Sequence, residues 1–116
     1  MTTLRGEPVV NIDPNPDRMV RVGQLEIDVA AMAVRLDGTR LHLPLREFQV
    51  LLLLADNAGR VLSPASIGSH VWEPGFEDTH GNLKIHINRL RNRMRAHVDQ
   101  DYIRTVRGVG YCLEAP

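Results

Sequence analysis

Residues 79–98 carry basic and amide side chains at a spacing that suits contact with a nucleic acid. This stretch holds Lys84, four arginines and three histidines, and it has no acidic residue. Apolar side chains recur in it at helical spacing and predict an amphipathic helix with one narrow buried stripe, made of Leu83, Ile87, Leu90 and Met94. The remaining surface presents Lys84, Ile85, Asn88 and Arg89. Arginine matches guanine, asparagine matches adenine and an apolar side chain can meet the thymine methyl group, so these residue types suit a major groove.

The charge of the chain is unevenly distributed. The whole sequence has 14 basic and 14 acidic residues, which by itself argues against a nucleic-acid partner. Residues 1–78 have a net charge of −4, however, and residues 79–116 a net charge of +4. Such asymmetry indicates a polyanion-facing element on a neutral body. From the charge run alone, a solvated helix face is an equally good interpretation.

A second signal lies downstream of the basic helix. Two short apolar stretches, 102–106 and 111–113, are joined by Arg107-Gly108-Val109-Gly110, which predicts a β-hairpin with an arginine at its tip. An arginine between glycines can enter a narrow A·T minor groove. Because two independent signals agree, we favour DNA binding over a solvated helix face.

The elements that must position these residues lie upstream. Alternating apolar residues over 20–43, with Met32 and Leu43 among the strand positions, predict three or four short antiparallel strands and a turn at Asp37-Gly38. A helix of about 14 residues follows, with Pro44 in its first turn and Gly59 beyond its end. Its expected buried face consists of Leu45, Phe48, Leu52 and Ala55. Ser63-Pro64 begins a short second helix that runs to Trp72.

Length and composition limit the remaining possibilities. The 116 residues suffice for one domain, which we place at 20–116, after a flexible leader or linker at 1–19 that has no room for a phosphoacceptor domain. No apolar run approaches membrane-spanning length, so we expect no membrane contact and a cytoplasmic location. A single cysteine, Cys112, cannot form an internal disulfide and is expected to be a strand residue. The scattered histidines lack metal-ligand spacing and no catalytic motif is present, so we expect no metal, no cofactor and no enzyme.

Five segments of the chain match one known family in their residues and in their order. They are Leu43-Pro44-Leu45-Arg46-Glu47-Phe48, 57–63, Val71-Trp72, 85–91 and 103–111, the last of which is the most specific. From about Val20 to Leu113 the chain therefore resembles the DNA-binding effector domain of OmpR/PhoB-type bacterial response regulators. The resemblance implies an α+β fold, a winged helix-turn-helix with an N-terminal antiparallel β-sheet, three helices and a C-terminal β-hairpin called the wing. It also implies tandem binding to direct repeats in promoter DNA. A loop at 73–79, with Glu73, Glu77 and Asp78, is then expected to contact RNA polymerase.

The resemblance also assigns roles to individual residues. It places Ile85, Asn88 and Arg89 at base edges, and Lys84 joins them on the same face. Phosphate contacts are expected from Trp72, His86, Arg91 and Thr105, and charge adds Arg93, Arg95 and Arg104. Arg107 is expected in the minor groove. The chain departs from the family pattern at several positions, including Gly81-Asn82 and Lys84, so its base sequence preference is expected to differ.

The predicted function is that of a sequence-specific, double-stranded DNA-binding transcriptional regulator domain. One alternative is a winged-helix protein–protein interaction module whose charged helix binds an acidic partner. Two assignments have simpler structural interpretations: Trp72 as a residue that covers the core, and His86 as an imidazole at the core edge.

Overall fold

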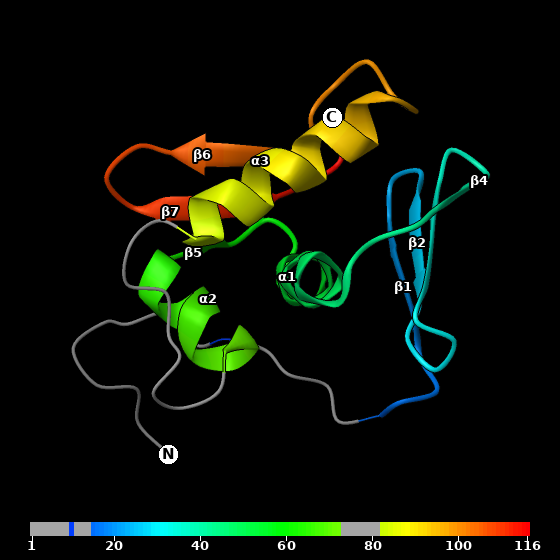
Figure 1. The fold of residues 1–116 in the computed structure, drawn as a ribbon, viewed down its shortest axis with the longest axis horizontal. Coiled ribbons are helices and arrows are strands. Elements are labelled where there is room, and N and C mark those ends of the chain that lie inside the picture. Colours follow the sequence, from blue (N-terminus) through cyan, green and yellow to red (C-terminus); the bar gives the residue numbers. More distant parts are fainter. Residues whose placement is uncertain (1–9, 11–14, 73–81) are drawn as a thin grey trace.

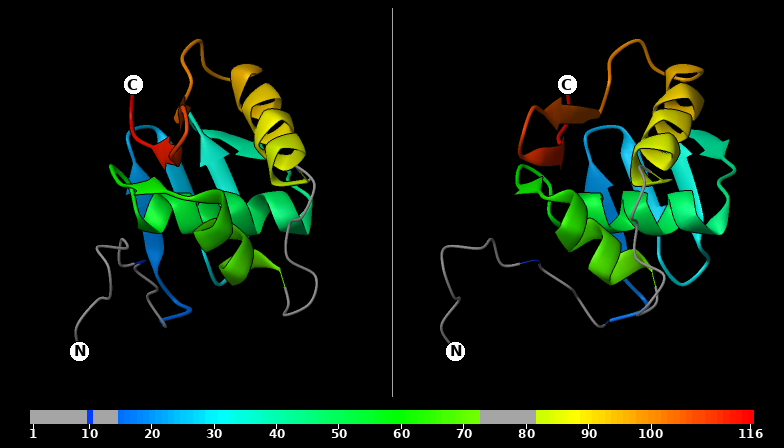
Figure 2. Two further views of the ribbon diagram at one scale, coloured as in Figure 1. Left: turned by 90° about the vertical axis from the view of Figure 1, so that its left-hand side faces the viewer. Right: turned by 60° about the vertical axis from the view of Figure 1, so that its left-hand side comes forward.

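The computed structural model describes residue 10, residues 15–72 and residues 82–116. Within these ranges two antiparallel sheets and three helices share one hydrophobic core. Helix α1 (Leu45–Asp56) lies at the centre, with the N-terminal sheet on one side and α2, α3 and the second sheet on the other (Figure 1). In both views of Figure 2, α1 runs across the strands of the N-terminal sheet. The predicted α+β winged-helix architecture is confirmed.

The N-terminal sheet has the four-stranded order β1-β2-β3-β4. Its strands are β1 (Met19–Val22), β2 (Leu25–Asp28), β3 (Ala33–Leu36) and β4 (Thr39–Leu41). Alternate side chains of these strands enter the core, as the sequence pattern predicted: Leu25, Ile27, Val34, Leu36 and Leu41. Two strand assignments were wrong. Met32 has a φ of 50° in the β2–β3 turn, and Leu43 follows the end of β4.

Helix α1 is buried on more than one face, which the sequence analysis did not predict. Leu45 is 55% exposed and Leu52 is only partly buried, so the expected stripe was wrong at these two positions. The core side chains of α1 are instead Phe48, Val50, Leu51, Leu53, Leu54 and Ala55. The cause is the central position of α1, which packs against β1 on one side and α2, α3 and β7 on the other. Pro44 precedes the helix as its N-cap residue and Asn57 follows it as its C-cap residue, so α1 has 12 residues rather than the expected 14 or so.

The second sheet has a strand that the sequence did not reveal. Strand β5 (Val61–Leu62) pairs with β7 (Gly110–Leu113), which pairs with β6 (Ile103–Val106), so the order is β5-β7-β6. A side chain at Gly110 would overlap the Leu62 carbonyl group, so this crossing requires glycine. A two-residue strand carries no alternating pattern and is therefore invisible to periodicity.

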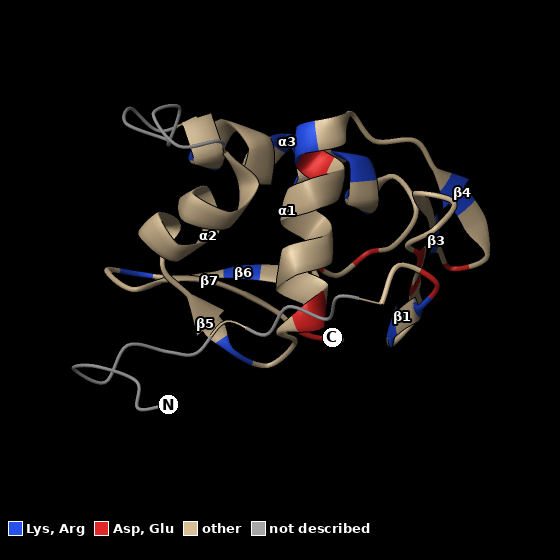
Figure 3. Ribbon diagram, turned by 90° about the horizontal axis from the view of Figure 1, so that it is seen from below, with Lys and Arg blue, Asp and Glu red and all other residues tan. Residues whose placement is uncertain are grey.

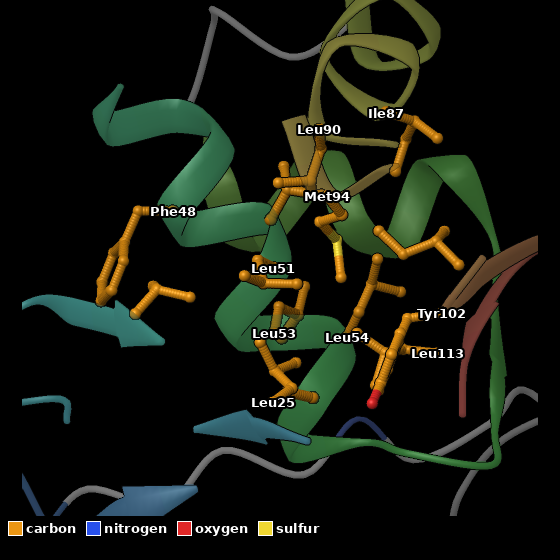
Figure 4. Packing of buried hydrophobic residues seen from close by; sticks show 14 of the residues in the cluster. Leu25, Phe48, Leu51, Leu53, Leu54, Ile87, Leu90, Met94, Tyr102 and Leu113 are labelled. Carbon is orange, nitrogen blue, oxygen red and sulfur yellow. The ribbon is translucent and has the colours of Figure 1, made fainter. Parts of the chain in front are cut away.

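The remaining helices begin and end close to their predicted positions. Helix α2 (Pro64–Val71) begins after Ser63, whose Oγ accepts a hydrogen bond from the Ser66 amide at 3.1 Å. Helix α3 (Asn82–Arg95) buries the predicted stripe of Leu83, Ile87, Leu90 and Met94. Figure 4 shows Leu90 and Met94 near the labelled α1 leucines, with Tyr102 and Leu113 completing this part of the core. The Tyr102 hydroxyl also accepts a hydrogen bond from the Gln24 amide at 2.8 Å, which links the C-terminal part of the core to the β1–β2 turn.

Candidate nucleic-acid interface

The four predicted base-reading residues lie together on the exposed face of α3. Lys84, Ile85, Asn88 and Arg89 are all exposed, and Ile85 is a large apolar side chain left 46% exposed. Within the described part of the chain, the polar side-chain groups of Lys84, Asn88 and Arg89 have no hydrogen-bond or ion-pair partner. Their hydrogen-bonding capacity is therefore available for another molecule.

The wing presents its arginine at an exposed turn. Arg107 lies between β6 and β7, and Gly108 has a φ of 77°, a conformation that favours glycine. The Val109 amide donates to the Val106 carbonyl at 2.9 Å and closes the turn. Figure 3 marks the basic residues along α3, on β6 and in this turn. Arg107 has no partner among the described residues, so the tip of the wing carries an uncompensated positive charge.

Arg91 connects α3 to the wing. Its Nε donates to the Ile103 carbonyl at 2.9 Å, and its Nη2 donates to the Thr105 Oγ1 at 2.7 Å. Its guanidinium carbon lies 5.9 Å from the centroid of the Tyr111 ring. The structure therefore brings together Arg91 and Thr105, two predicted phosphate contacts that lie 14 residues apart in sequence. The sequence analysis did not predict this contact.

The other three arginines assigned to phosphates already have carboxylate partners. Arg93 Nε lies 3.2 Å from Glu47 Oε1, and Arg104 Nε lies 2.5 Å from Glu114 Oε1. Arg95 binds both carboxylate oxygens of Asp101 at 2.8 Å, which raises the pKa of Arg95 and lowers that of Asp101. Their positive charge is therefore partly compensated within the chain, which a count of charged residues cannot show.

Trp72 and His86 meet at the end of α2 and the first turns of α3. Their ring centroids are 5.8 Å apart, and the rings are tilted by 48°. Arg46 of α1 lies on the Trp72 ring, with its guanidinium carbon 5.6 Å from the ring centroid, and it donates to the Val71 carbonyl. Trp72 packs against the core, which supports its packing role. The sequence analysis missed Arg46 as a neighbour of this pair, although Arg46 stands in the first matching motif.

Several other expectations concern residues away from this surface. Glu73, Glu77 and Asp78 lie outside the described residues. Cys112 is a buried strand residue of β7, and burial raises the pKa of its thiol, so it is a poor nucleophile.

The described ranges contain no group of histidine, cysteine and acidic residues that could hold a metal ion. No helix in them is both long and apolar enough to span a membrane. The leader prediction stays a prediction, although Arg18 near its end forms an ion pair with Asp56 at 2.6 Å.

Helices α2 and α3 followed by an arginine-tipped hairpin form a winged helix-turn-helix domain, and α3 exposes Lys84, Asn88 and Arg89 as that class of nucleic-acid-binding domain requires. Residues 38–113 match the profile of the family described as "Transcriptional regulatory protein, C terminal". The chain belongs to this family, which comprises the DNA-binding domains of OmpR/PhoB-type response regulators and is not a family of enzymes.

Individual relatives agree with this assignment. The chain is 40% identical over 94 residues to the regulatory protein VanRB of Enterococcus faecalis. This aligned region covers 81% of the chain and 41% of VanRB. It is 34% identical over 96 residues to the transcriptional regulatory protein CusR of Escherichia coli, covering 83% of the chain and 42% of CusR. The chain thus spans about half the length, or less, of the curated relatives it matches.

Solved structures share the fold. The DNA-binding domain of CpxR from E. coli aligns over 84% of this chain and 97% of that domain, with 28% identity and a TM-score of 0.73. The RstA DNA-binding domain of Klebsiella pneumoniae, solved in complex with the RstA box, aligns over the same shares with 26% identity and a TM-score of 0.72. The resemblance found in the sequence is confirmed.

Proposed function

We propose that this domain binds double-stranded promoter DNA sequence-specifically, with α3 in the major groove and the wing in the adjoining minor groove. The observation that carries the proposal is that the side chains of Lys84, Asn88 and Arg89 on α3, and of Arg107 at the wing tip, have no polar partner among the described residues. A major groove admits an α-helix, and a narrow minor groove attracts arginine. The RstA domain, which has the same fold, is known in complex with its DNA box.

The contacts divide into those that read bases and those that position the protein. Lys84, Ile85, Asn88 and Arg89 contact base edges, because their side chains lie on the exposed face of α3. Arg107 enters the minor groove. Phosphates are bound by Trp72, His86, Arg91 and Thr105, with weaker contributions from the carboxylate-paired arginines Arg93, Arg95 and Arg104.

Further expectations rest on family membership. Two copies bind adjacent direct repeats in tandem, because a single module of this size buries a limited protein surface and binds weakly alone. Acidic residues Glu73, Glu77 and Asp78 contact RNA polymerase. A protein that acts on promoters in this way works in the cytoplasm.

Selection of genomic DNA fragments with the purified protein, followed by footprinting, tests the proposal. The expected result is a protected site with two repeats at a fixed spacing, and a preference over scrambled duplex of at least about 1,000-fold at physiological salt. Equal binding to the selected and scrambled duplexes would refute DNA recognition and would favour the protein–protein interaction module. A titration that follows a strict one-to-one isotherm on the footprinted site would refute tandem binding.

A further inference from the structure

The structure links α3 to both strands of the wing through Arg91. The guanidinium group of Arg91 donates hydrogen bonds to Ile103 and Thr105 on β6 and lies against the Tyr111 ring on β7. Its side chain is half-buried, so water competes with these contacts less than it does at an exposed arginine. The other paired arginines of α3, Arg93 and Arg95, bind Glu47 and Asp101 instead.

The position of β6 explains why such a link matters. β6 is an edge strand, since the sheet order is β5-β7-β6, so no other strand of the described residues pairs with its outer side. Helix α3 is fixed to α1 through the buried stripe, and α1 also contacts β7. The contacts of Arg91 therefore fix the edge strand of the wing directly to the helix that carries the base-reading residues.

We propose that Arg91 is a positioning residue, which sets the wing at the angle to α3 that lets Arg107 reach the minor groove. This inference rests on the DNA-binding function proposed above. It does not remove Arg91 from the phosphate contacts, because the guanidinium group has further N–H groups and the Thr105 hydroxyl can still donate after accepting from Arg91. It assigns to Arg91 a role in specificity that phosphate neutralisation alone does not give.

A double-mutant cycle separates positioning from phosphate neutralisation. Arg91→Lys keeps the positive charge but loses the planar fork that holds two acceptors at once. Affinity for the footprinted duplex is measured by fluorescence anisotropy for wild type, Arg91→Lys, Arg107→Ala and the double variant. If Arg91 positions the wing, Arg107→Ala costs much less in the Arg91→Lys background, with a coupling of about 5-fold or more.

Arg95→Lys provides the matched control. Arg95 also lies on α3 and also binds an acceptor pair, but its partner is Asp101 rather than a wing strand. The fold-losses in DNA affinity caused by Arg95→Lys and by Arg107→Ala should therefore multiply in the double variant, without coupling. Thr105→Val is a second variant, which removes one acceptor of Arg91 while leaving the arginine in place, and it should show part of the coupling to Arg107→Ala.

Amide hydrogen exchange without DNA gives an independent readout. The Val109 amide, which closes the wing turn, should exchange faster in Arg91→Lys, whereas the α1 amides should be unchanged. Independent losses in the Arg91→Lys and Arg107→Ala cycle would overturn the inference, whatever the exchange rates. If wild-type protein shows no preference for its selected duplex, the proposed function fails and the inference about the minor groove fails with it. Unchanged exchange at Val109 would then show that Arg91 does not hold the wing either.

Discussion

The Arg93–Glu47 ion pair attaches α3 to α1, and its loss should destabilise the domain. Glu47 is 1% exposed, and its Oε1 lies 3.2 Å from Arg93 Nε. Arg93→Ala would leave this carboxylate among core side chains without the donor. A buried charge without a partner is costly because the carboxylate loses its hydration and gains nothing in exchange.

The exposure of Arg93 limits the expected cost. Removing one partner of a fully buried ion pair costs about 3–5 kcal/mol. The Arg93 side chain is 43% exposed, so water can approach the site, and we expect about 2 kcal/mol, within the range for a buried group left without its hydrogen bond. For a domain of this size, that change lowers Tm by roughly 10 °C.

Thermal and urea unfolding, followed by circular dichroism, measure this effect. Arg95→Ala is the matched control, because its pair with Asp101 has side chains 51% and 38% exposed, so water and salt screen it and its loss should change stability much less. Adding Glu47→Gln to Arg93→Ala removes the buried charge and should restore part of the lost stability. Equal losses in Arg93→Ala and Arg95→Ala, without recovery in the double variant, would refute the reasoning.

Three further predictions concern recognition, packing and pH. Arg89→Ala should cost about 1–3 kcal/mol on the selected duplex and relax the preference at one base position, which competition with base-substituted duplexes measures; equal loss on random duplex would contradict it. Gly110→Ala should lower the free energy of unfolding by about 1–3 kcal/mol, because the new Cβ overlaps the Leu62 carbonyl group and separates β5 from β7. The hydrogen bonds from Arg95 lower the pKa of Asp101 below its ordinary 3.8, so the stability that they contribute is fully present above that ordinary value and is lost as the pH falls through the lowered pKa of the folded protein. The stability difference between wild type and Asp101→Asn should therefore shrink on acidification, and a difference independent of pH would contradict this sign.

The parts of the site that sequence alone predicted are those determined locally. The buried stripe of α3 follows from a 3.6-residue period, and burying that stripe automatically exposes Lys84, Asn88 and Arg89. The wing hairpin likewise follows from two apolar stretches around a glycine-containing turn. In both cases neighbours in sequence determine which side chains face outward, so no long-range information was needed.

The parts that the sequence did not predict depend on packing between distant segments. Leu45 was assigned to the core because it fits a single helical stripe, but α1 lies between two layers and buries other faces instead. Strand β5 exists because β7 offers it a pairing edge, and its two residues have no pattern of their own. A periodicity argument assumes one buried face and so fails for the central helix of a layered fold.

The same distinction changes the electrostatic description of the domain. From the sequence, all four of these arginines were predicted to bind phosphates: Arg91, Arg93, Arg95 and Arg104. The structure places them in three different environments. Arg93 meets a buried carboxylate, Arg95 and Arg104 meet exposed ones, and Arg91 meets a carbonyl, a hydroxyl and an aromatic ring. Arg91 alone of the four has no carboxylate hydrogen-bonded to it, and although its charge also acts on the nearby Asp101, less of that charge is compensated than in the other three arginines. It can therefore hold the wing and attract a phosphate at the same time, whereas each of the other three must share its charge with a carboxylate when DNA binds.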